Sequence, residues 1–301
     1  MTERVYCSRL AAEANADPAG TAVQVEVWLL LEYPRPWKPR ALQDNDLPPA
    51  VQAVLDHLPV EAQRSGVELR IQFIKQAASA DIVQPRVFVA DDRAGQMRLT
   101  GGVLDDYGSI AALTLEKILA HDLPQAESIT DEIYLVCTNG QRDVCCARFG
   151  LPLFETLRIA HDSRIWQTTH LGGHRYAPNL LCLPSGYIYG FVAPEQAEEL
   201  VAEHDQGRLA VAQLRGRSAL PKPAQAAEIA LRKQQALQRI GDVERVLVDQ
   251  LDNAWRVRLR CADGADTEFA VRRQKLAEPI IASCGAEPKV DYVFQVDEAL
   301  H

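Results

Sequence analysis

Two short segments of the chain concentrate residue types that bind metals. The first runs Cys137-Thr-Asn-Gly-Gln-Arg-Asp-Val-Cys145-Cys146, and the second is His170-Leu-Gly-Gly-His174. Thiolates and imidazoles are common protein ligands of zinc and of iron–sulfur clusters. Two of each complete the shell of one tetrahedral zinc ion, and they equally complete that of a two-iron cluster with two protein ligands on each iron. The spacing alone therefore predicts a metal and leaves iron and zinc open.

The elements around these segments could position the ligands. Cys137 directly follows Glu132–Val136, which we predict to be a strand, and a polar loop occupies Gly140–Cys146. A loop of this length can wrap around a cluster and aim both thiolates inward. We predict that Pro152 begins the next helix, because proline is favoured in a first turn, and the helix N-terminus would favour the thiolate of Cys146. The glycines between the two histidines allow the backbone to pass close to an inorganic centre.

The rest of this region follows a known order of elements. A strand is predicted at Arg164–Thr168, a hairpin at Leu180–Leu183 and Tyr187–Val192, and a last helix from Pro194. Apolar residues in these stretches follow the periods of strands and helices. The resulting order, β-α-β-β-β-α, is that of a thioredoxin-like domain.

The first part of the chain repeats this order. Its strands are predicted at Val23–Leu31, Val67–Ile74, Arg86–Ala90 and Met97–Thr100, and its helices at Leu47–Leu58 and Ser109–Ala120. Pro85 precedes the third strand here, as Pro178 precedes the corresponding strand later. We therefore hypothesise an internal duplication in which only the second unit has kept the cysteines.

The last part of the chain has a different pattern. A polar helix is predicted from Pro221 to Ile240, and four strand-like stretches follow at Val243–Asp249, Trp255–Arg260, Thr267–Val271 and Asp291–Val296. This pattern is typical of a small α+β appendage, and it contains no catalytic signature. The predicted fold class is α/β, with two thioredoxin-like units and this C-terminal segment. We place the three domains at 1–125, 126–215 and 216–301.

Composition argues against several classes of protein. The chain has 301 residues and a net charge of −9, which disfavours a nucleic-acid partner. No apolar run approaches the length of a membrane span. The first residues lack a basic segment followed by an apolar one, so we expect no signal peptide and a cytoplasmic location. The seven cysteines are odd in number in a long chain, which is not the pattern of a small disulfide-stabilised domain.

From Cys137 to Gly190 the sequence resembles the sucrase/ferredoxin-like family, which belongs with the thioredoxin-like [2Fe–2S] ferredoxins. The resemblance rests on the two metal-binding segments, on the continuation Arg175-Tyr-Ala-Pro-Asn-Leu, and on Tyr187-Ile-Tyr-Gly190. The N-terminal stretch Trp28-Leu-Leu-Leu-Glu-Tyr-Pro-Arg-Pro-Trp37 also resembles the family. In total the resemblance covers roughly residues 1–205.

This resemblance implies a cofactor and its ligands. The family's second cysteine comes three residues after an Arg-Asp pair, and Arg142-Asp143 puts it at Cys146, so Cys145 would point away from the centre. The implied cofactor is a [2Fe–2S] cluster, and its implied ligands are Cys137, Cys146, His170 and His174. Two neutral imidazoles in place of two thiolates make such a cluster less negative and raise its reduction potential.

The implied function is electron transfer, in an electron carrier or reductase module rather than a hydrolase. The histidine side is expected to face solvent, and the expected partner is a redox protein such as a flavoprotein reductase. Arg142, Asp143 and Arg175 are candidates to tune the site by charge or hydrogen bonds. Cys182 lies in an apolar run and is predicted to be buried and inert, whereas Cys7, Cys261 and Cys284 have no predicted partners.

Two rival functions remain open. The first is a binding or scaffold protein of the same fold, stabilised by zinc on the same two cysteines and two histidines. For either metal, Cys145 is the alternative to Cys146 as a ligand. The second is a dithiol oxidoreductase that uses Cys137 with Cys145 or Cys146. The second is weaker, because no Cys-x-x-Cys stands at the start of a helix.

Overall fold

The computed structural model describes residues 5–95 and 97–298. Its first unit contains the strands β1 (Val27–Glu32), β2 (Leu69–Lys75), β3 (Arg86–Asp91) and β4 (Arg98–Val103) and the helices α2 (Pro49–Arg64) and α3 (Leu115–Ala120). β1 pairs with β2 in parallel and with β3 in antiparallel fashion, and β3 pairs antiparallel with β4. The strand order of this unit is therefore β2-β1-β3-β4.

The second unit repeats this topology. It contains β6 (Ile133–Cys137), β7 (Ile165–Thr168), β8 (Leu180–Leu183) and β9 (Tyr187–Tyr189) with the helices α4 (Val144–His161) and α5 (Ala197–Asp205). β6 pairs in parallel with β7 and antiparallel with β8, which pairs antiparallel with β9. The prediction of two thioredoxin-like units is confirmed, and the repeated topology agrees with the hypothesised duplication.

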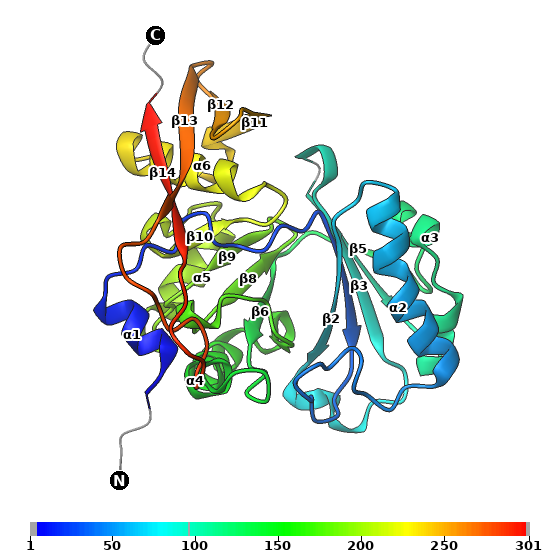
Figure 1. The fold of residues 1–301 in the computed structure, drawn as a ribbon. Helices are drawn as coiled ribbons and strands as arrows, with labels where there is room; N and C mark the ends of the chain where they lie inside the picture. Colours follow the sequence, from blue (N-terminus) through cyan, green and yellow to red (C-terminus); the bar gives the residue numbers. More distant parts are fainter. Residues whose placement is uncertain (1–4, 96, 299–301) are drawn as a thin grey trace.

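One sheet runs through both units. β2 and β7 pair antiparallel at their ends, with Ile74 opposite Thr168 and Lys75 opposite Gln167. β5 (Glu127–Ile129) and β10 (Leu214–Arg217) complete the outer edges. The resulting ten-stranded order is β10-β9-β8-β6-β7-β2-β1-β3-β4-β5, and the helices lie on the outside of the two halves (Figure 1). The predicted boundary between residues 215 and 216 falls inside β10.

Alternation along the strands divides the apolar residues between two faces. On β6, Tyr134 and Val136 pack in the cluster that includes residues of α4 and α5. Ile133, Leu135 and Cys137 point the other way, into a cluster shared with residues of β1 such as Trp28. Strand geometry thus places the Cys137 side chain between the two halves of the sheet.

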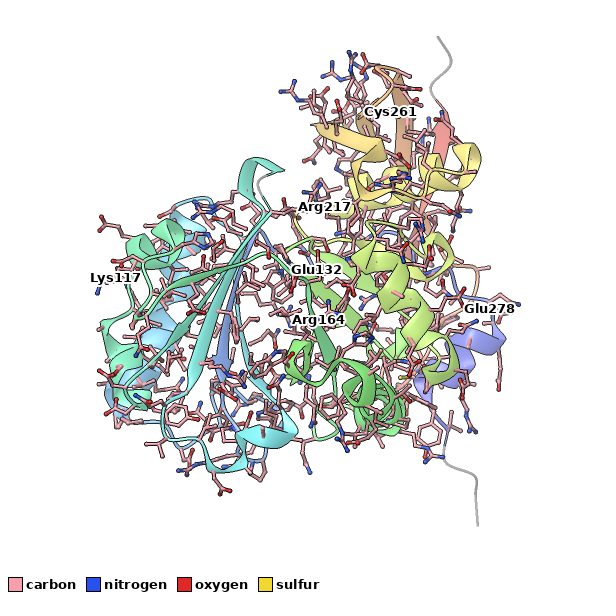
Figure 2. The ribbon with its side chains drawn as sticks, turned by 180° about the vertical axis from the view of Figure 1, so that it is seen from behind. Lys117, Glu132, Arg164, Arg217, Cys261 and Glu278 are labelled. Atoms are coloured by element: carbon pink, nitrogen blue, oxygen red, sulfur yellow. The ribbon has the colours of Figure 1, made fainter. Side chains whose placement is uncertain are left out.

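The C-terminal part adds the helix α6 (Lys222–Gln235) and an antiparallel sheet of β11 (Val243–Gln250), β12 (Trp255–Cys261), β13 (Asp266–Lys275) and β14 (Tyr292–Glu298). α6 lies between the two sheets, so the predicted α+β appendage is confirmed. The loop over residues 276–291, between β13 and β14, returns to the main body beside the N-terminal helix α1 (Cys7–Glu13) (Figure 1). Figure 2 shows Glu278 of this loop next to α1 and Cys261 in the small sheet.

Several predicted helices have different bounds in the structure. α2 spans Pro49–Arg64 and not Leu47–Leu58, and α5 begins at Ala197 after a 3₁₀ turn at Pro194–Gln196. α4 begins at Val144, well before Pro152, because the Asp143 carboxylate accepts the backbone N–H of Cys145 at 2.9 Å and caps an earlier first turn. The helix predicted at Ser109–Ala120 is broken, since Thr114 caps α3 as a separate helix. α6 ends at Gln235, because Ala236 adopts a left-handed conformation (φ = 54°).

Short 3₁₀ turns connect the larger elements. They lie at Ala77–Asp81, Arg93–Gly95, Tyr107–Ala112, Asp162–Arg164, His174–Tyr176, Pro194–Gln196, Val211–Gln213 and Ile240–Asp242. Within the part of the chain that the structure describes, no helix is long and apolar enough to cross a membrane.

Candidate metal centre

The two predicted cysteine ligands lie together at one end of the second unit. Cys137 is the last residue of β6, and Cys146 is in the first turn of α4; the two side chains are 2% and 0% exposed. Their close approach depends on Gly150 of α4, because a Cβ atom there would lie only 2.2 Å from the Cys137 carbonyl oxygen. A glycine at this position therefore lets the helix rest directly on the end of the strand.

The two histidines face these thiols from the loop after β7. His170 Nδ1 lies 3.6 Å from Cys146 Sγ and 3.9 Å from Cys137 Sγ. His174 Nδ1 is 3.3 Å from His170 Nε2, and its other ring nitrogen is 3.5 Å from an Asp143 carboxylate oxygen. The structure thus brings Cys137, Cys146 and His170 together, and it places His174 behind His170, between that ring and Asp143.

The two glycines between the histidines are required by backbone conformation. Gly172 and Gly173 have φ values of +90° and +66°, a region that L side chains rarely adopt. A Cβ atom on Gly173 would also lie 2.2 Å from Arg215 Nη2. The buried Arg215 guanidinium donates hydrogen bonds to the Gly172 carbonyl at 2.9 Å and to Asn179 Oδ1 at 2.8 Å, which holds the loop from behind.

The first unit, which contains none of the predicted ligands, also positions this loop. Arg70 on β2 donates a hydrogen bond to the His170 carbonyl oxygen at 2.6 Å. The backbone N–H of Thr169 donates to the Phe73 carbonyl at 2.9 Å, and its hydroxyl also contacts Gln72. The position of His170 therefore depends on the seam between the two units.

Electrostatics within the thiol pair favour one thiolate. A hydrogen bond from Cys146 lowers the pKa of Cys137, and His170 and the Leu171 backbone N–H lower it further against the effect of burial. The same hydrogen bond and burial raise the pKa of Cys146. Burial lowers the pKa of His174, which favours its neutral, metal-binding form.

The Asp143 carboxylate remains ionised beside this group. Its burial opposes the charge, but hydrogen bonds from the backbone N–H groups of Cys284 and Cys145 lower its pKa. Because the His174 ring nitrogen faces this carboxylate at 3.5 Å, Asp143 can orient the ring by accepting its N–H.

Three of the four predicted donors lie close enough together to bind one metal ion, whereas His174 lies outside this group, with its Nδ1 against the Nε2 of His170. Cys137, Cys146 and His170 offer three ligand atoms that all lie within 4.8 Å of one another. Sulfur and nitrogen ligands on one tetrahedral zinc ion would be about 3.6 Å apart, from the usual metal–ligand bond lengths, and the observed 3.6 and 3.9 Å agree. The same donor types complete a two-iron cluster. The arrangement of the donor atoms by itself therefore does not distinguish a zinc ion from a two-iron cluster.

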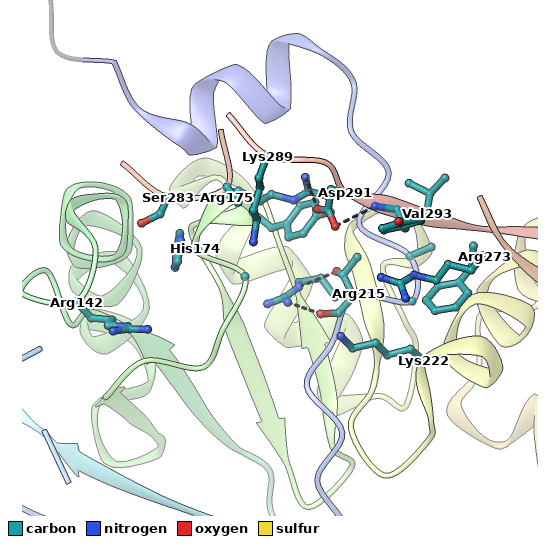
Figure 3. A pocket seen from close by; sticks show the side chains of 18 residues that line it. Arg142, His174, Arg175, Arg215, Lys222, Arg273, Ser283, Lys289, Asp291 and Val293 are labelled. Atoms are coloured by element: carbon teal, nitrogen blue, oxygen red, sulfur yellow. Dashed lines mark hydrogen bonds and ion pairs between the residues drawn. The ribbon is translucent and has the colours of Figure 1, made fainter. Parts of the chain in front are cut away.

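The histidine side of the group is the more accessible side. His170 and His174 are half-buried, and each lines a different cavity. The cavity beside His174, about 570 Å³ in volume, is lined by six cationic side chains: Arg142, Arg175, Arg215, Lys222, Arg273 and Lys289 (Figure 3). Asp291 in its wall pairs with Arg175 at 3.1 Å. The surroundings of the histidines are thus basic although the whole chain carries a net charge of −9.

The second cavity, about 610 Å³ in volume, continues this basic region beside His170. Arg40 and Arg70 line it, and Arg142 lines both cavities. An anionic surface or molecule would therefore be attracted to either side of the histidine loop.

The remaining cysteines show what sequence reasoning missed. Cys145 faces away from Cys137, as expected, but it meets Cys7 and Cys284, for which no partner was predicted. These residues come from opposite ends of the chain, and no motif spacing links them. Cys182 is fully buried in the core of the second unit, as predicted. All seven cysteines are free thiols.

Fold and donor set together define a thioredoxin-like protein with a candidate metal centre of two cysteines and two histidines. A model of the sucrase/ferredoxin-like family matches residues 18–216, and the chain belongs to this family. The match covers both thioredoxin-like units and ends inside β10.

Two relatives share the name altered inheritance of mitochondria protein 32. The protein from Meyerozyma guilliermondii is 34% identical over 88 residues, which are 26% of this chain and 31% of the relative. The protein from Clavispora lusitaniae is 30% identical over 112 residues, which are 35% of this chain and 41% of the relative. The chain thus spans less than half the length of these curated relatives.

Two similar solved structures are of a thioredoxin-like [2Fe–2S] ferredoxin from Aquifex aeolicus. One is 19% identical and covers 31% of this chain and 97% of its own, with a TM-score of 0.28. The other, a cysteine-to-serine variant, is 20% identical and covers 28% of this chain and 96% of its own, with a TM-score of 0.25.

Proposed function

We propose that this protein transfers electrons through a [2Fe–2S] cluster held by Cys137, Cys146, His170 and His174. The observation that carries the proposal is that two segments of the second unit bring these cysteines and histidines close together, in a member of the sucrase/ferredoxin-like family. When bound, the cluster would accept and release one electron. The protein would act as an electron carrier or as a reductase module rather than as a hydrolase.

The protein's own residues would then have three roles. The buried thiols of Cys137 and Cys146 exclude solvent from one side of the centre. The half-buried histidines form the side through which electrons would pass to a partner by outer-sphere transfer. Hydrogen bonds from Arg70 and Arg215 hold the histidine loop in place, and the Leu171 N–H donates to the Cys137 sulfur.

The basic cavities on both sides of the histidines indicate the chemistry of the partner. A redox protein with an acidic surface around its own centre, such as a flavoprotein reductase, would dock there, and complementary charge would accelerate the encounter. This attraction weakens with added salt. We expect such a partner in the cytoplasm, where the seven free thiols would stay reduced.

A zinc-stabilised scaffold is the second candidate function. It is favoured by one observation, the 3.6 and 3.9 Å spacing of His170 Nδ1 from the two sulfur atoms, which suits a single tetrahedral ion. Zinc in this position would stabilise the fold without redox activity.

The test is to purify the full chain without oxygen and measure its visible spectrum, iron, sulfide and zinc. The electron-transfer proposal expects a coloured protein with about two irons per chain, whose absorption bleaches with dithionite. A colourless protein whose Cys137–His170 centre holds zinc, lost on Cys137→Ser substitution, would overturn it. A chain that never binds metal but reduces disulfides would support the dithiol function instead.

A further inference from the structure

Three thiols gather at a second place in the molecule, on the far side of α4's first turn from His170. Cys7 Sγ is 3.6 Å from Cys145 Sγ, Cys145 Sγ is 3.2 Å from Cys284 Sγ, and Cys284 Sγ is 3.6 Å from Cys7 Sγ. The three residues come from α1, from α4 and from the loop over residues 276–291. Cys7 and Cys145 are completely buried, and Cys284 is half-buried.

We propose that Cys7, Cys145 and Cys284 form a second metal site that binds Zn²⁺ through three thiolates, with the Asp143 carboxylate as the fourth donor. All four ligand atoms lie within 4.8 Å of one another. Thiolates on a tetrahedral zinc ion would be about 3.8 Å apart, from the usual zinc–sulfur distance. The observed spacing of 3.2–3.6 Å therefore requires only a small expansion to admit the ion.

Asp143 is already oriented toward the three sulfurs. Its carboxylate accepts the backbone N–H of Cys145 at 2.9 Å, that of Cys284 at 2.9 Å and the Ser283 hydroxyl at 2.8 Å. These bonds tie the carboxylate to two of the three cysteine-bearing segments. In addition, the Cys7 N–H donates to Cys284 Sγ at 3.4 Å, and N–H groups aimed at sulfur stabilise a thiolate shell.

The residues around the three thiols are apolar, which favours a structural metal site that is closed to solvent. Ala177 completes the buried core of the cluster, and Tyr6, Phe149 and Ile281 pack around it. Zinc bound by thiolates in such an apolar shell is typical of structural sites, which keep no open position for substrate. Binding exchanges three thiol protons for one Zn²⁺ and needs no oxidant. A disulfide between two of these cysteines would need an oxidant and would leave the third thiol behind.

The consequence of this site is mechanical coupling of the chain ends to the candidate metal centre. Cys145 precedes Cys146 directly, and Asp143 also faces His174. Zinc would therefore hold α1 and the loop over residues 276–291 against the turn that aims Cys146 at Cys137. Cys7 and Cys284 both lie outside residues 18–216, so the family's matched region alone does not contain this site.

The experiment measures iron and zinc separately in the full chain, produced with both metals available. Wild-type protein is expected to contain about one zinc ion per chain at this site. Cys284→Ser and, independently, Cys7→Ser should lose that zinc and keep the iron and the visible spectrum. Cys137→Ser should lose the iron and keep the zinc. Cys261→Ser is the matched control, because Cys261 is also a buried thiol but lies in the small sheet (Figure 2).

The separate readouts distinguish this proposal from the function proposed above. If the Cys137 centre holds zinc instead of iron, wild-type protein should contain about two zinc ions, and Cys284→Ser should still remove one. Should a variant fold poorly, wild-type protein supplies the test: alkylation of the half-buried Cys284 should be blocked until a chelator removes zinc. Zinc that is absent from wild type, zinc that is unaffected by both substitutions, or a disulfide among these cysteines in anaerobically purified protein would overturn the site.

Discussion

The two thioredoxin-like units share one topology, but they differ in the residues at one corner. This corner is formed by the C-terminal end of the first strand and the segment that follows the second strand. The last residue of the first strand is Cys137 in the second unit and Glu32 in the first. Glu32 is 1% exposed, and its carboxylate accepts hydrogen bonds from the Arg86 guanidinium, the Arg86 backbone N–H and the Ser79 hydroxyl. The corner of the first unit is thus a closed ion-pair network, whereas that of the second offers thiols and imidazoles.

This difference shows that the fold supplies a position and the residues supply the chemistry. In both units the end of the first strand meets the segment after the second strand, because the parallel pairing of these strands brings their C-terminal ends together. In the first unit Gln76 follows β2 and bonds to Arg86 at 2.8 Å. In the second unit the corresponding segment carries the two histidines. The first unit also supports the second, through Arg70.

The largest expected effect is the loss of the cofactor from the second unit's corner. Cys146→Ser should lose almost all iron and visible absorption, because serine does not replace a thiolate ligand. Cys145→Ser, at the neighbouring position, should keep its iron, since Cys145 faces Cys7 and Cys284. Iron and sulfide per chain measure both. Loss of iron from Cys145→Ser with retention in Cys146→Ser would reverse the ligand assignment.

The corresponding change in the first unit should affect stability and leave the cofactor intact. Glu32→Ala leaves the Ser79 hydroxyl and the Arg86 backbone N–H and Nε without the acceptor that Glu32 provides, so we expect the free energy of unfolding to fall by about 2–4 kcal/mol. Urea unfolding measures the loss, and iron content should not change. Exposed Glu127→Ala is the control and should change stability by less than about 0.5 kcal/mol. Loss of iron from Glu32→Ala would show that the two corners are not independent.

A smaller effect should separate the two glycines of the histidine loop. Gly172→Ala should cost about 1–2 kcal/mol, because it places a side chain at φ = +90° without a steric clash. Gly173→Ala should cost at least about 1 kcal/mol more, since its Cβ atom would displace the Arg215 guanidinium. Release of iron to a chelator should likewise be faster for Gly173→Ala. Equal behaviour of the two variants would mean that Arg215 does not support the loop.

The smallest expected effect is a pH dependence of the reduction potential, which only the second unit can produce. Reduction makes the cluster more negative and raises the pKa of its histidine ligands. Between the oxidised and reduced pKa values each electron brings a proton, so the potential should fall as pH rises, by up to about 59 mV per pH unit. Replacing both histidines with cysteine should lower the potential and remove this slope. A wild-type potential that is constant from neutral to alkaline pH would contradict the prediction.

Local patterns account for the part of the fold that could be predicted. Short apolar runs and, in the last part of the chain, two-residue alternation indicated the strands, and both β-α-β-β-β-α orders agree with the structure. The start of α4 could not be predicted from Pro152, because the deciding interactions are the Asp143 cap and the contact of Gly150 with Cys137. The Asp143 cap is a local interaction for which an aspartate before the helix is a signal, whereas the contact of Gly150 with Cys137 depends on how the helix packs on the strand.

For the site, the sequence by itself determined the donor types, their grouping in two short segments and the glycines that the histidine loop requires. The tertiary structure alone decided that Arg70 and Arg215 hold that loop and that basic cavities flank it. It also brought together Cys7, Cys145 and Cys284, whose contacts join residues 138, 139 and 277 positions apart. Spacing can predict a site when its ligands lie on one or two short segments. Contacts across most of the chain depend on the packing of whole elements.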